Sequence, residues 1–151
     1  MSIVADYDLD FHEWITRNVE LLRDGRPSEI DAEHIAEELE SMGERDLRQL
    51  RSRLQVLVMH LLKWQYQPER QEMSWIQTID HQRDEIEALL LDSPSLRGTL
   101  SAALEQIYPK AVRSADHETG LPAATFPAFC PYLLDDILDA AFLPSGSRPE
   151  R

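Results

Sequence analysis

The sequence has one cysteine, five glycines among 151 residues and no long hydrophobic run. Cys130 has no partner for an internal disulfide, and a single thiol suits a reducing compartment. The most apolar stretch is interrupted by His60 and Lys63, far short of the roughly 20 residues that a membrane span needs. The first ten residues are acidic, whereas a secretory signal begins with basic residues. We therefore expect a cytoplasmic protein that does not associate with membranes.

Several catalytic signatures are also missing from the sequence. It contains no glycine-rich phosphate loop, no set of cysteines at zinc-binding spacing and no nucleophile-elbow pattern. Nothing in the sequence therefore requires chemistry, and we expect no cofactor.

The net charge of −13 is distributed unevenly. Residues 1–43 carry three basic and twelve acidic side chains, residues 44–83 seven and five, and residues 84–151 five and eleven. An acidic surface repels phosphate backbones, so general nucleic-acid binding is not expected. The middle segment can form a cationic patch, or its cations can pair with acidic residues of the same chain. These cations are Arg45, Arg48, Arg51, Arg53, Lys63, Arg70 and Arg83.

The most apolar helix is predicted for residues 47–67. Its leucines, at positions 47, 50, 54, 57 and 61, alternate steps of three and four and so form one stripe. Its second half is apolar on nearly every side, which is typical of the central helix of a bundle.

Two helices are predicted before this one. Asp10 and Glu13 form a capping-box pattern that opens a helix over residues 10–23. Asp31 is the expected N-cap of the second helix. Gly43 can mark a kink there, or the segment can continue directly into the central helix because no proline follows.

Three helices are predicted after it. Ser74 and Gln77 form another capping-box pattern. Ser93 is the expected cap of a helix that begins at Pro94 and ends at Thr119. Pro109 should bend this helix, and Pro131 can begin a last helix.

The expected fold is all-α, because no stretch alternates apolar and polar residues long enough to predict a strand. Short connections predict an antiparallel helical bundle of about five helices around a long central helix. We expect one bundle domain over residues 1–144 and a disordered tail over residues 145–151.

The sequence contains an ordered set of short motifs, namely YD at 7–8, DF at 10–11 with Trp14, EELESMG at 37–43, HLLKWQYQP at 60–68, SW at 74–75, QR at 82–83, DSPSL at 92–96, ETGL at 118–121, FP at 126–127 and CPY at 130–132. Together these motifs resemble the bacterial domain-of-unknown-function family numbered 29. The resemblance covers about residues 7–144. It implies a compact all-helical domain and no assigned reaction.

One candidate ligand site involves polar residues on the two most apolar predicted helices. In an antiparallel hairpin, His60 should lie opposite Asp80. A buried cation needs a partner, so Lys63, Trp64 and Arg83 could join them in a pocket for an anionic ligand, either bound or hydrolysed. The alternative is a satisfied buried network that fixes the helix register.

Other residues suggest weaker candidate sites. His34 and Glu38 are spaced to share a helix face, and with His81 they are candidates for a carboxylate–histidine metal site; the alternative is a solvated acidic face. Cys130 precedes Pro131 and could occupy a helix N-cap, where the helix dipole favours a reactive thiolate; the alternative is a small packed residue.

Three functional hypotheses follow. The first is a cytoplasmic, non-catalytic helical module for protein interaction or regulation, acting on a partner protein or as a homo-oligomer. The second is the anionic-ligand or hydrolytic pocket at His60, Lys63 and Arg83. The third is the metal site.

Overall fold

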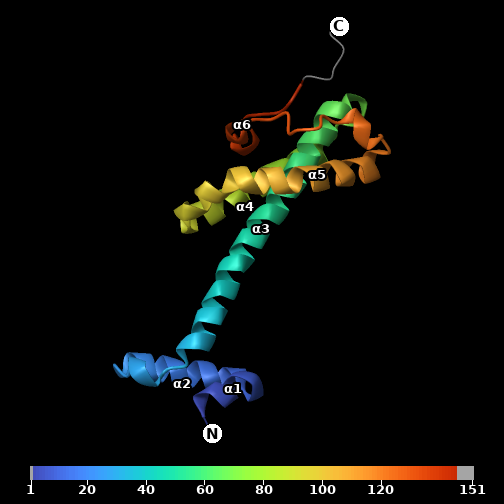
Figure 1. The fold of residues 1–151 in the computed structure, drawn as a ribbon. Coiled ribbons are helices and arrows are strands. Elements are labelled where there is room, and N and C mark those ends of the chain that lie inside the picture. Colours follow the sequence, from blue (N-terminus) through green and yellow to red (C-terminus); the bar gives the residue numbers. More distant parts are fainter. Residues whose placement is uncertain (1, 146–151) are drawn as a thin grey trace. The chain divides into compact units, whose positions relative to one another are not determined.

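The computed structural model describes residues 2–145, and this part of the chain is helical without strands (Figure 1). The all-α prediction is therefore confirmed. Four short 3₁₀ turns separate the helices. No helix among these residues is long and apolar enough to cross a membrane. The helices are α1 (Ile3–Leu9), α2 (Phe11–Arg23), α3 (Ala32–Tyr66), α4 (Met73–Asp92), α5 (Leu100–Thr119) and α6 (Leu134–Leu138).

Contacts within the chain divide it into two compact units, Met1–Arg45 and Asp46–Arg151. The single domain expected over residues 1–144 stays a prediction. Of the expected disordered tail, residues 146–151 lie outside the described part of the chain.

The second predicted helix and the central helix are one continuous helix, α3, of 35 residues. It passes through Gly43 without a break, because glycine lowers helix stability by only about 1 kcal/mol whereas proline would interrupt the hydrogen-bond ladder. Leu50, Leu54, Leu57 and Leu61 are all fully buried, as their spacing predicted, whereas Leu47 is half-buried.

Polar contacts hold the N-terminal unit together. Asp10 caps α2 by accepting a hydrogen bond from the backbone N–H of Glu13 at 3.1 Å, as predicted. The buried Trp14 donates its indole N–H to Asp31 at 2.9 Å, and the backbone N–H of Asp31 donates to Asn18 at 2.9 Å. These bonds join α2 to the start of α3.

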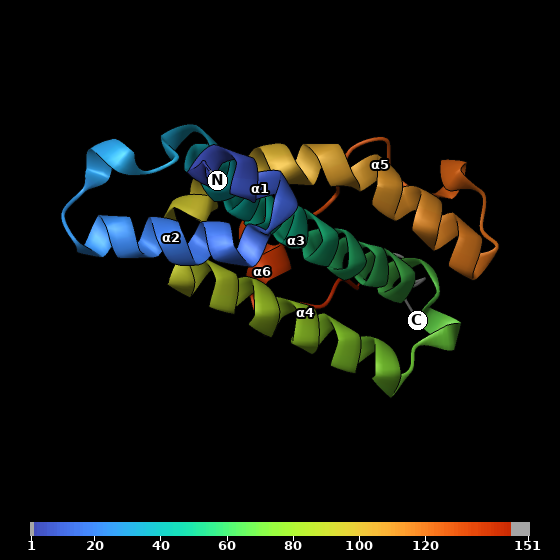
Figure 2. The ribbon, with the colours of Figure 1, turned by 90° about the horizontal axis from the view of Figure 1, so that it is seen from below.

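The C-terminal unit has a conventional apolar core. Figure 2 shows α4 and α5 on opposite sides of the second half of α3. Buried side chains from α3, α4, α5 and α6 form one cluster. Examples are Leu57, Ile79, Ile86, Ala111 and Ile137, each fully buried.

Two predicted helix starts were wrong. Helix α4 begins at Met73 with Glu72 as its N-cap, so Ser74 lies inside the helix. Helix α6 begins at Leu134 rather than at Pro131. The hydroxyl of Tyr132 donates a hydrogen bond of 2.6 Å to Gln65 of α3. This bond fixes the chain to α3 just before α6 begins.

Candidate functional site

Lys63 is buried, and it already has partners within the chain. Its ammonium group lies 3.1 Å from Glu118 of α5 and 4.6 Å from the ring centre of Trp75 in α4. Its side chain is 10% exposed, whereas that of Glu118 is 49% exposed. The charge is therefore neutralised at the edge of the core, which matches the structural alternative for this residue.

His60 is bonded to its own helix, and Asp80, its predicted partner, is exposed on α4. The Nδ1 atom of His60 lies 2.8 Å from the carbonyl oxygen of Val56, and burial lowers the pKa of His60. The half-buried imidazole is thus neutral and bonded to its own helix. Trp64, the neighbour of Lys63, is half-buried.

Arg83 binds the backbone of the C-terminal segment around α6. It is 5% exposed, and it donates hydrogen bonds of 2.8 Å to the carbonyl oxygens of Ile137 and Phe142. Burial lowers the pKa of Arg83, and the nearby carboxylates of Asp80 and Asp139 act in the opposite direction. Lys63 and Arg83 therefore engage different elements, α5 and the segment around α6. A ligand-binding role for the five predicted residues stays a hypothesis.

His34 and Glu38 face Tyr7 of α1. The rings of Tyr7 and His34 stack at 4.0 Å, and the Tyr7 hydroxyl donates to the carboxylate of Glu38. His34 Nδ1 lies 2.6 Å from Asp31, and this hydrogen bond raises the pKa of His34. His81 is exposed on α4. Within residues 2–145, no group of three or more His, Cys, Asp or Glu side chains has the arrangement to hold a metal ion.

Cys130 does not occupy a helix N-cap, because α6 begins four residues later. Its half-buried thiol contacts the carbonyl oxygen of Tyr132 at 3.6 Å. Burial raises the pKa of Cys130, which favours the thiol over the thiolate. Of the two alternatives for Cys130, the structure therefore favours the small packed residue over the activated nucleophile.

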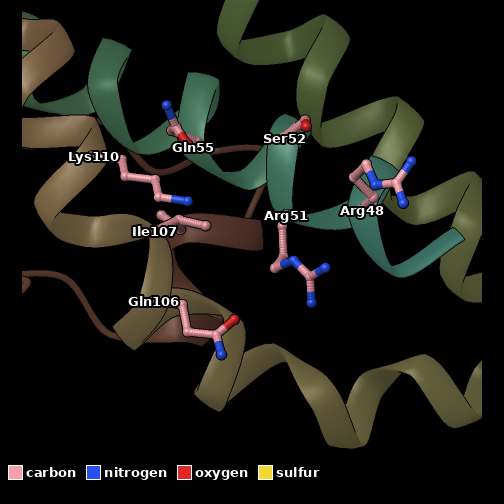
Figure 3. Close-up of a pocket in the computed structure, with 7 residues that line it drawn as sticks. All are labelled: Arg48, Arg51, Ser52, Gln55, Gln106, Ile107 and Lys110. Carbon is pink, nitrogen blue, oxygen red and sulfur yellow. The ribbon is translucent and has the colours of Figure 1, made fainter. Parts of the chain in front are cut away.

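A basic pocket lies between α3 and α5, and it includes Arg48 and Arg51 of the cationic middle segment. Its volume is about 580 Å³. Figure 3 shows the lining side chains of α3, among them Arg51, beside those of α5, among them Lys110. No carboxylate lines the pocket. The lining residues are Arg48, Arg51, Ser52 and Gln55 of α3 and Gln106, Ile107 and Lys110 of α5.

The α3 half of the basic pocket follows from helical spacing. Its four lining residues fall at steps of three, one and three, so they share the face of α3 opposite the buried leucines. Arg48, Arg51 and Lys110 make no ion pair with any carboxylate of residues 2–145. In contrast, Arg53 pairs with Glu85 at 3.5 Å. The cationic patch and the internally paired arginines, which the sequence left as alternatives, both occur.

Comparison with known proteins gives a family match. The family model described as "Domain of unknown function DUF29" matches residues 7–143, which confirms the resemblance stated from the motifs. No curated protein and no solved structure matches the chain significantly.

Proposed function

The chain belongs to the family described as domain of unknown function DUF29, and we propose from its basic pocket that it is a non-catalytic module that binds a small anionic ligand. One observation supports this proposal above the others. In a chain with a net charge of −13, three cations line one depression and none of them pairs with a carboxylate of the described residues. Such an arrangement leaves a local positive potential for a ligand to neutralise.

The lining chemistry suits phosphate or carboxylate groups. A guanidinium presents a planar fork of N–H donors that matches either group, and Lys110 adds a point charge. The amides of Gln55 and Gln106 and the hydroxyl of Ser52 offer further hydrogen bonds. The volume of about 580 Å³ falls within the range of roughly 300–1,000 Å³ that is usual for small-molecule sites.

The same lining favours binding over hydrolysis. Ser52 is the only hydroxyl among the lining residues, and no histidine, carboxylate or thiol lines the pocket beside it to act as a general base. We therefore place the function in ligand recognition. We place the protein in the cytoplasm, because a lone half-buried thiol suits a reducing compartment.

Isothermal titration calorimetry of the full chain with inorganic phosphate tests the proposal. We expect saturable binding by the wild type and at least a tenfold weaker association for the double variant Arg51→Gln, Lys110→Gln. Arg113→Gln is the matched control, because it removes one exposed charge from α5 outside the basic pocket. The proposal fails if phosphate, sulfate and acetate all give no binding at about 10 mM, or if the control weakens binding as much as the double variant.

A second candidate function, protein interaction, rests on the exposed apolar face of α2. Phe11, Ile15, Val19 and Leu22 are between 39% and 50% exposed, and their spacing sets them in one stripe. The unit Met1–Arg45 carries four basic and thirteen acidic side chains. Because two such acidic units repel each other, the partner that fits is a protein segment with apolar residues flanked by Lys and Arg.

The interaction function is tested with a designed amphipathic helix of leucine and lysine and its leucine–glutamate counterpart. We expect the basic peptide alone to bind, and Ile15→Glu with Val19→Glu to abolish that binding. His12→Glu with Thr16→Glu is the control, since both are exposed polar residues of α2 that border the stripe without belonging to it. Equal binding of the two peptides, an unaffected stripe variant, or a stable homodimer that buries the stripe in light scattering would contradict this candidate.

A further inference from the structure

A second cavity adjoins the basic pocket and differs from it in character. Its volume is about 170 Å³, and it shares Arg51 and Gln106 with the basic pocket. The rest of its lining is apolar apart from one hydroxyl, namely Leu47, Leu50, Ala102, Ala103 and Thr99. We name this cavity the apolar annex. A ligand anchored on Arg51 can therefore extend into apolar surroundings.

We propose that the ligand is an amphipathic small molecule whose anionic group binds in the basic pocket and whose compact apolar or aromatic group fills the apolar annex. This inference rests on the proposed anion-binding function and specifies its ligand class. Arg51 is the residue that both cavities share on α3, so the anion and the apolar group must be close together in the ligand.

The lining of the apolar annex is suited to an apolar group. Leu50 is fully buried and Ala103 is 5% exposed, so these two residues belong to the fixed core of the unit. The hydroxyl of Thr99 donates to the carbonyl oxygen of Leu96 at 2.6 Å, which leaves it no need of a ligand as acceptor. No charged residue other than Arg51 lines the annex.

The size of the apolar annex limits the apolar group. An apolar cavity of roughly 150 Å³ in another protein is large enough to bind benzene. The annex, at about 170 Å³, thus has room for a phenyl ring or a short branched alkyl group. A small apolar group buried beside the anion should tighten binding about tenfold relative to the anion alone.

Calorimetry with paired ligands tests the inference on the full chain. Phenyl phosphate is compared with inorganic phosphate, and benzoate with acetate, so that the two pairs separate a phosphate-bearing ligand from a carboxylate. We expect the phenyl group to tighten binding about tenfold in the pair whose anion binds. Phenyl compounds no tighter than their parent anions in either pair would overturn the inference.

Variants at the mouth of the apolar annex localise the effect. Ala102 is exposed on α5 and lines the annex but not the basic pocket, so Ala102→Leu should remove the phenyl gain and leave phosphate binding intact. Ser101→Leu is the matched control, because Ser101 is exposed and lines neither cavity. Ala102→Met repeats the test if circular dichroism shows that the leucine variant is unfolded. A phenyl gain that persists in the folded Ala102 variants refutes the annex.

The outcomes separate this inference from the function on which it rests. If neither phosphate nor acetate binds and the phenyl compounds also fail to bind, the proposed function and this inference are both wrong. If a parent anion binds and the phenyl compound gains nothing, only this inference is wrong.

Discussion

Replacing Arg83 by methionine should destabilise the C-terminal unit by about 3–5 kcal/mol. The guanidinium is 5% exposed and donates two hydrogen bonds of 2.8 Å, to the carbonyl oxygens of Ile137 and Phe142. A hydrogen bond from a charged donor contributes about 1.5–3 kcal/mol, and the bond to Ile137 is buried, so that carbonyl group has no water to replace its lost donor. Methionine keeps most of the apolar volume, so the loss reports mainly on these bonds.

Urea unfolding followed by circular dichroism measures this change. Arg97→Met is the control, because Arg97 lines the same cavity of about 270 Å³ but is exposed, and its replacement should change the free energy of unfolding by less than about 0.5 kcal/mol. Arg83→Lys keeps the charge but lacks the planar guanidinium with its several N–H donors, so the loss in the free energy of unfolding should be intermediate. If Arg83→Met falls within about 0.5 kcal/mol of the wild type, the guanidinium does not hold the C-terminal segment.

Three further predictions concern the other polar side chains. Glu118→Gln removes the carboxylate partner of the buried Lys63 and should reduce the free energy of unfolding by about 1–2 kcal/mol. The control Glu105→Gln, on the exposed surface of α5, should reduce it by less than about 0.5 kcal/mol. Equal losses in the two variants would contradict a stabilising ion pair. The hydrogen bond to Asp31 raises the pKa of His34 above 6.5, so its contribution to stability is complete below about pH 6.5 and is lost as the pH rises through the higher folded value. The urea midpoint of the wild type, followed by tryptophan fluorescence, should therefore decrease as the pH is raised from about 6 to about 8. An unchanged dependence of the midpoint on pH in His34→Gln would refute this. Burial raises the pKa of Cys130, so iodoacetamide should label it at least about tenfold more slowly at pH 7 than it labels the urea-unfolded chain, and equal rates would show an open thiol.

Much of the helical architecture was predictable because it depends on local periodicity. The leucine spacing of α3 and the cap at Asp10 are features of neighbouring residues, and both were confirmed. The start of α6 was not predictable in the same way. It depends on Tyr132 and Arg83, whose partners lie more than fifty residues away in the sequence.

The candidate sites show the same limit. The sequence identified Arg48 and Arg51 as members of a cationic segment, but it could not identify which cations pair within the chain. Lys110 gave no signal at all, because it joins the pocket only through the packing of α5 on α3. The contact between Lys63 and Trp75 could not be predicted either, because hydrophobic periodicity fixes the face of a helix more firmly than its translation along a neighbour.

The shortness of α6 has a consequence for the order of folding. A helix of five residues is not stable in isolation, and the arginine that binds the carbonyl oxygen of Ile137 lies 54 residues earlier in the chain. The hairpin of α3 and α4 must therefore assemble before α6 can form. The same dependence makes α6 the first element of its unit to open in the native state, so its amide protons should exchange with solvent ahead of those of the α3 core.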